Sequence, residues 1–124
     1  AGRESATTQL EAFRDRIRDF VGQRLRDPDL SIDRIAQGLN CSKRHLHKAF
    51  SDEDDTLAHY ILRRRLHGCM RDLKDPAQAQ RTLTDIALSW GFSHSAHFSR
   101  VFREHTGLSP SDFRQLSRDS VVTG

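Results

Sequence analysis

The chain has few cysteines, no long apolar run and no secretory leader. Its two cysteines, Cys41 and Cys69, are far apart in 124 residues. They cannot form the disulfide framework of a small secreted domain, and they lack the paired spacing of a zinc site. No apolar run exceeds four residues, whereas a membrane-spanning helix needs about 20. Segment 1–6 lacks the apolar stretch of a signal peptide and resembles a disordered tail or a junction left by cloning. These absences predict a reduced, cytoplasmic chain without membrane contact.

Lysine is also scarce, although the chain is basic. Twenty basic residues against 17 acidic ones give a net charge of +3 and a pI near 9.3. Seventeen of the basic residues are arginines and only three are lysines. Arginine presents a planar fork of donors that suits phosphate groups and guanine. A genome rich in GC codons would give the same bias, so the composition leaves both explanations open.

Apolar residues recur at spacings of three and four along almost the whole chain, which predicts helices and no strand. Serine or threonine precedes most of the apolar segments, as is typical of helix N-caps, and Gly107 closes the sixth helix. The seven expected helices cover about 10–25, 31–39, 42–50, 56–73, 82–90, 93–106 and 109–116. The expected capping residues are Ser31, Ser42, Thr56, Thr82, Ser93 and Ser109. In the last two helices we expect His94, His105 and Leu116 to join the apolar side.

The sequence contains an internal repeat. Residues 35–42 read Ile-Ala-x-x-Leu-Asn-Cys-Ser, and residues 86–93 read Ile-Ala-x-x-Trp-Gly-Phe-Ser. Each copy predicts a short helix, a tight turn at Asn40 or Gly91, and a second helix. This is the helix-turn-helix pattern, in which the second helix enters the DNA major groove. Two copies in one short chain are much more specific than one.

The repeat also predicts the domain organisation. The fold class is all-α and homeodomain-like, with two helix-turn-helix subdomains joined by a long central helix. A central helix of 18 residues would span about 27 Å, enough to hold two recognition helices for successive major grooves about 34 Å apart. The expected segments are a first lobe at 7–55, a connecting helix at 56–74, a second lobe at 75–118 and a frayed tail at 119–124.

Helical-wheel positions separate a core side from an outward side in both second helices. The outward sets contain cations, hydroxyls and small residues but no carboxylate, which favours DNA binding over an ordinary solvated face. Arg44, Lys48, Arg100 and Arg103 can reach guanine or phosphate. The candidates for base readout are Arg44, His47, Lys48, Ser95, Ala96, Ser99 and Arg100. The candidates for phosphate contact are Ser31, Ser42, Lys43, Ser51, Ser93, His97 and Arg103.

Residues 86–114 resemble the signature of the AraC/XylS family of bacterial transcription regulators. The stretch reads Ile-Ala-x-x-Trp-Gly-Phe-Ser, then Phe-Ser-Arg-x-Phe-Arg from Phe98, and finally Gly-x-Ser-Pro-x-x-Phe-Arg from Gly107. The likeness to the family's DNA-binding domain extends over about 10–116. It departs at Asn40, where the family has glycine, at Cys69, where alanine is usual, and in a shorter acidic loop after Phe50.

The resemblance carries its own expectations. It implies a seven-helix domain of two lobes that binds promoter DNA and acts, usually as an activator, through RNA polymerase. It places base-reading positions at Arg44, His47 and Lys48, and in the second copy at Ser95, Ala96, Ser99 and Arg100. It also implies a bacterial protein at the nucleoid whose N-terminal effector or dimerisation domain is missing from this chain.

Other kinds of site find little support in the sequence. His94 and His97 are three residues apart and could ligate a metal, but the sequence places no third ligand beside them. No cysteine or histidine has the partner acid or glycine turn that nucleophilic catalysis needs. We therefore expect no metal, no cofactor and no catalytic residue. A helical protein-interaction module without specific DNA binding is the alternative function.

Overall fold

The computed structural model describes residues 2–50 and 55–123, with side chains for 7–50 and 55–119. Within these residues the chain forms seven α-helices and one 3-10 turn, with no strand. The elements are α1 (Gly2–Arg24), α2 (Ile32–Gly38), α3 (Lys43–Phe50), α4 (Leu57–Lys74), η1 (Pro76–Gln78), α5 (Leu83–Ser89), α6 (Ser95–Thr106) and α7 (Pro110–Thr123). The all-α, seven-helix prediction is confirmed.

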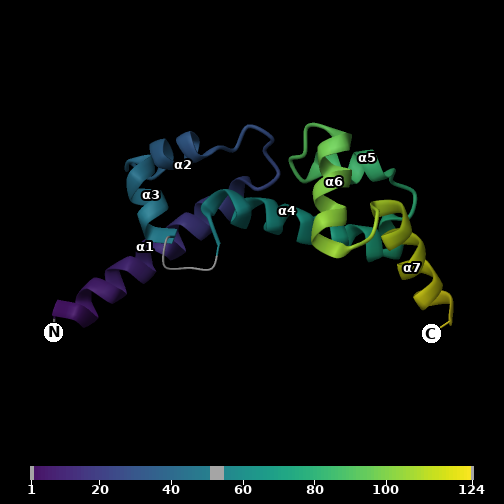
Figure 1. The fold of residues 1–124 in the computed structure, drawn as a ribbon, viewed down its shortest axis with the longest axis horizontal. Helices are drawn as coiled ribbons and strands as arrows, with labels where there is room; N and C mark the ends of the chain where they lie inside the picture. Colours follow the sequence, from purple (N-terminus) through teal and green to yellow (C-terminus); the bar gives the residue numbers. More distant parts are fainter. Residues whose placement is uncertain (1, 51–54, 124) are drawn as a thin grey trace. The chain divides into compact units, whose positions relative to one another are not determined.

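The chain divides into two compact units, 1–63 and 64–124 (Figure 1). The division falls inside α4, between Arg63 and Arg64. Its first part buries Leu57, Tyr60 and Ile61, and its second part buries residues that include Leu66 and Cys69.

Both ends of the chain are helical where the sequence analysis placed tails. α1 begins at Gly2, and α7 continues to Thr123. No proline occurs before Pro28 or after Pro110, so nothing in these stretches removes a backbone donor or forces the helix to stop. The helix bounds therefore differ from the tails drawn at 1–6 and 119–124.

The first unit packs α1, α2 and α3 against one another. Ile17 and Val21 of α1 and Ile35 of α2 are fully buried, as is Leu46 of α3. Arg14 of α1 donates from Nε to the carbonyl oxygen of Ala49 at 2.7 Å, which satisfies a backbone acceptor in the last turn of α3. The buried residues of α1 thus determine which side of α3 packs inward, and the Arg14 hydrogen bond stabilises the C-terminal end of α3.

The second unit is built on an aromatic cluster. The ring centroid of Phe98 lies 5.1 Å from that of Phe92 and 5.5 Å from that of Phe102. Phe102 in turn meets Phe113 of α7 edge-on, with ring centroids 5.3 Å apart. Such pairs add about 0.5–1.5 kcal/mol to the area they bury. The cluster therefore fixes α6 between the turn that precedes it and α7.

Trp90 joins α5 to α4 within this unit. Its indole N–H donates to Asp72 at 2.8 Å, and a Cβ at Gly68 would lie 2.5 Å from its ring. Glycine at position 68 thus lets the indole approach the α4 backbone.

α7 is held by Arg114, which donates to the carbonyl oxygen of Gln78 at 2.8 Å. Burial, with a smaller effect of the neighbouring Arg118, lowers the pKa of the Arg114 guanidinium from its usual value.

Most predicted caps are confirmed. The hydroxyls of Ser31, Ser42, Thr56, Thr82 and Ser109 each accept a hydrogen bond from the backbone N–H three residues on, at 3.0–3.1 Å. Leu116 was expected on the apolar side of the last helix, and this is wrong: it is 53% exposed. The half-buried positions of that helix instead include Phe113, Arg114 and Ser117.

The cap of α3 gives a direct test of these local signals. We expect Ser42→Ala to lower the free energy of unfolding by about 1 kcal/mol, because the N–H of His45 loses its acceptor. Urea titration followed by circular dichroism measures this. Ser99→Ala, an exposed serine inside α6, is the matched control and should change stability by no more than about 0.5 kcal/mol. Equal effects of the two substitutions would contradict the capping role.

Candidate nucleic-acid interface

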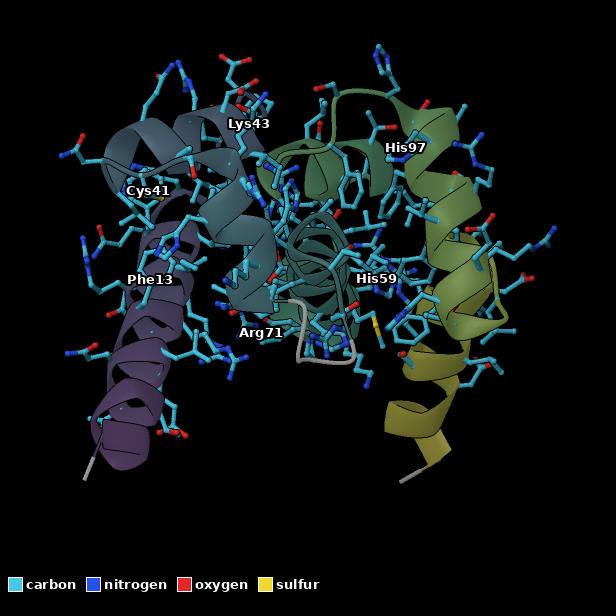
Figure 2. All side chains as sticks on the ribbon, turned by 60° about the vertical axis from the view of Figure 1, so that its left-hand side comes forward. Phe13, Cys41, Lys43, His59, Arg71 and His97 are labelled. Atoms are coloured by element: carbon cyan, nitrogen blue, oxygen red, sulfur yellow. The ribbon has the colours of Figure 1, made fainter. Side chains whose placement is uncertain are left out.

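The first candidate helix, α3, follows a tight turn at Asn40. Asn40 has a φ of 54°, in the left-handed region that asparagine tolerates better than most residues. The turn brings the chain from α2 into α3, whose Leu46, Ala49 and Phe50 face the core. Phe13 of α1, labelled in Figure 2, has its ring centroid 4.5 Å from that of His45 of α3, and the ring planes are tilted by 37°.

The opposite side of α3 carries the predicted base-reading residues. Arg44, His47 and Lys48 are all exposed, and α3 contains no carboxylate. They share one helix face because positions three and four apart are neighbours on a helix. The structure therefore brings these three candidates together.

The phosphate candidates of the first unit have different environments. Lys43 is ion-paired with Asp33 of α2 at 3.0 Å, with both side chains more than half exposed. Ser31 and Ser42 accept cap hydrogen bonds, and each hydroxyl keeps a proton that it can donate to an anion. Ser51 lies outside the described residues.

The second candidate helix, α6, begins later than the sequence predicted. Its N-cap is His94, whose side chain makes no cap hydrogen bond, so the expected cap at Ser93 is wrong. The reason is the one extra residue in the second copy of the repeat. In both copies the first core residue, Leu46 or Phe98, is the fourth residue of its helix. The extra residue therefore lies before the first residue of α6, and the N-cap position falls on His94 instead of Ser93.

α6 buries one face and exposes the other. Phe98, Val101 and Phe102 are buried. The exposed residues include every predicted contact on this helix: Ser95, Ala96, His97, Ser99, Arg100 and Arg103. His97, labelled in Figure 2, has its ring centroid 6.1 Å from that of Phe92. His94 and His105 are exposed rather than inward, which corrects the expectation for both.

A hollow of about 700 Å³ lies along the exposed side of α6. Ser95, Ser99, Arg100 and Arg103 line it from α6, and the first turns of α5 and α7 complete it. Helix N-termini carry a partial positive charge that favours anions. At these two starts Thr82 and Ser109 already accept from the N–H groups of Asp85 and Asp112, so only part of each first turn remains for a ligand. The hollow thus combines two arginines with hydroxyls and two helix starts.

Sequence reasoning missed several residues of this hollow. Thr84, Ser109 and Ser111 contribute hydroxyls from the starts of α5 and α7, and Glu104 contributes a carboxylate. The capping signals at Thr82 and Ser109 marked these helix starts, but only the tertiary fold brings them against α6. Glu104 is the one acid of α6, and it follows Arg103 directly.

Comparison with known proteins identifies the family of the chain. A family model described as a helix-turn-helix domain matches residues 35–116. The probable transcription factor PqrA of Proteus vulgaris is 36% identical over 91 residues, which cover 73% of this chain and 72% of that protein. The XylDLEGF operon transcriptional activator of Pseudomonas putida is 32% identical over 107 residues, covering 85% of this chain and 33% of the relative. The chain therefore spans only about a third of this longer relative.

Solved structures share the fold. The C-terminal domain of AraT, a response regulator from Geobacillus stearothermophilus, aligns with a TM-score of 0.75 at 21% identity, over 82% of this chain and 83% of that one. The C-terminal domain of the two-component response regulator yesN from Fusobacterium nucleatum aligns with a TM-score of 0.76 at 17% identity, over 83% of this chain and 98% of that one. Within the described residues, no helix is both long and apolar enough to cross a membrane. The matched family model, the relatives and the duplicated helix-turn-helix units together show that the chain belongs to the AraC/XylS-type helix-turn-helix family of DNA-binding transcription regulators.

Proposed function

We propose that the chain reads a specific double-stranded promoter site by inserting α3 and α6 into successive major grooves. The observation that carries this proposal is the same division in both helices: an apolar face in the core, and an exposed face with two cations or more. In this proposal Arg44, Lys48 and Arg100 contact guanine, and Ser99 and His47 contact base edges or phosphates. Ala96 is suited to the methyl group of thymine.

The phosphate contacts would orient the chain on the duplex. In the first unit they come from Lys43 and from the hydroxyls of Ser31 and Ser42, with Ser51 kept as a candidate from the sequence. In the second unit they come from Ser93, His97 and Arg103. The hollow beside α6 supports this role, because its two helix starts would meet the backbone of one DNA strand.

The wider role follows from the relatives. Several of them are named transcriptional activators, so we propose activation through RNA polymerase as the regulatory mode. We also propose that the full-length protein acts at the bacterial nucleoid and has an N-terminal effector or dimerisation domain. A protein-interaction module without specific DNA binding is the competing function.

Selection of bound sites from random DNA tests sequence reading. We expect two short recurring motifs about one helical turn apart, one for each recognition helix. A single motif would contradict insertion of both helices. Absence of any enriched motif would favour the protein-interaction alternative.

Salt dependence gives a second, independent measurement. Each phosphate contact releases counterions, so log K for DNA should fall with log salt at a slope of about −0.9 per contact. Fluorescence anisotropy with a selected site and with a scrambled one, from low to moderate salt, measures this slope. A protein-interaction module would show the same weak affinity for both DNAs throughout.

A further inference from the structure

Two histidines from distant parts of the sequence meet within the second unit. His67 of α4 and His105 in the last turn of α6 have their Nε2 atoms 3.3 Å apart, with ring centroids separated by 5.2 Å. Both residues are exposed. The geometry points to a site at this pair for a divalent zinc-type cation, held by both Nε2 atoms.

The separation of the two nitrogens matches tetrahedral coordination. Zinc–imidazole bonds of about 2.0–2.1 Å at a tetrahedral angle of about 109° place the two nitrogens about 3.3–3.4 Å apart. Bonds of the same length at 90° would place them about 2.8–3.0 Å apart. The observed separation of 3.3 Å lies in the range for a tetrahedral ion.

Binding also has a simple proton balance. In the metal-free pair, a hydrogen bond joins the two Nε2 atoms, so one of them carries the proton that is shared. A metal needs the lone pair on both Nε2 atoms, so that proton moves to Nδ1 of its own ring by exchange with water. Imidazole nitrogens are ligands that suit zinc and its neighbours in the first transition series.

The pair forms an open site. Among the residues whose side chains are described, no group of three or more histidine, cysteine or carboxylate residues is arranged to hold a metal. Water therefore fills the remaining positions, and the affinity is lower than that of a structural site with four protein ligands. Arg64 and Arg71, one turn away from His67 on α4, oppose a cation and weaken binding further.

The consequence of binding is local. The ion would join the last turn of α6 to α4, so it favours the folded form of the second unit over the unfolded chain. At a metal concentration ten times the dissociation constant, the folded form gains a factor of 11, equivalent to about 1.4 kcal/mol. This raises the thermal midpoint by several degrees.

The test uses the whole chain freed of metal with a chelator and then dialysed. Titration with zinc chloride should raise the thermal midpoint progressively, about linearly with the logarithm of zinc concentration above the dissociation constant. It should also shift the Cε1–H proton resonances of two histidines. His67→Gln and His105→Gln should each abolish the rise. Magnesium, which prefers oxygen ligands, should give no rise.

His97→Gln is the matched control. It removes an exposed histidine of α6 that belongs to the other histidine pair considered from the sequence, and it should leave the zinc-induced rise intact. The site is refuted if zinc produces no rise up to millimolar concentration, or if the rise survives in His67→Gln. Loss of the rise in His97→Gln would also overturn it, because the metal would then bind at His94 and His97.

Discussion

Phe98→Ala should lower the free energy of unfolding of the second unit by about 3–5 kcal/mol, the range for truncating a buried aromatic ring. Phe98 is 2% exposed and touches aromatic rings on both sides, Phe92 at 5.1 Å and Phe102 at 5.5 Å. Alanine removes these contacts and leaves a cavity that the rest of the cluster cannot fill without shifting α6. Because small domains have only about 5–15 kcal/mol of stability, this loss is a large part of the total.

The chain offers a site-specific probe for this experiment. Trp90 is its only tryptophan and lies in the second unit, so tryptophan fluorescence during urea titration reports on that unit. Leu116→Ala is the control: this leucine of α7 is 53% exposed, and its truncation should cost no more than about 0.5 kcal/mol. A loss below about 1 kcal/mol in Phe98→Ala would mean that the aromatic cluster does not support α6 as described.

Arg100→Ala should weaken binding to a selected DNA site by about 1–3 kcal/mol and relax the preference at one base position. Arg100 is exposed on α6 and lines the hollow formed with α5 and α7. A bidentate contact to guanine is lost completely on truncation, whereas a scrambled site offers no such contact to lose. Arg44→Ala should behave in the same way, but its effect should fall in the other motif.

Arg100→Ala also removes a positive charge, so a control must separate this general electrostatic effect from the loss of a base contact. Arg118→Ala removes one positive charge from α7, where the side chain donates to the carbonyl oxygen of Ala79. It should lower the affinity for selected and scrambled DNA by equal, small amounts. If Arg100→Ala also weakens both DNAs equally, Arg100 contacts phosphate rather than a base, and base readout by α6 depends on Ser99 and its neighbours.

Much of the fold could be predicted from the sequence because its signals are local. The cap hydrogen bonds at Ser31, Ser42 and Thr82 each involve residues three positions apart. The turns at Asn40 and Gly91 need a positive φ, and asparagine and glycine are the residue types that adopt it most readily. The apolar spacing of three and four residues identified the buried face of α3 and of α6.

The errors have physical causes that are not local. His105 was placed inward on the wheel, but its partner is His67, 38 residues away, and only the packing of α4 on α6 reveals the pair. The cap at Ser93 failed because the core position of Phe98 sets where the helix starts, and this overrides the serine. Of the candidate site, the exposed faces were predictable, whereas the helix starts that surround the hollow were not.

The ion pair between Lys43 and Asp33 has a consequence for how tightly DNA can be held. A phosphate that approaches this ammonium group must displace a carboxylate, so one anion replaces another and the net electrostatic gain is only their difference. If Lys43 contacts phosphate as proposed, Asp33 would compete with the DNA backbone for this ammonium group. This competition would lower the affinity for every sequence alike and leave discrimination between sites to the contacts that read bases.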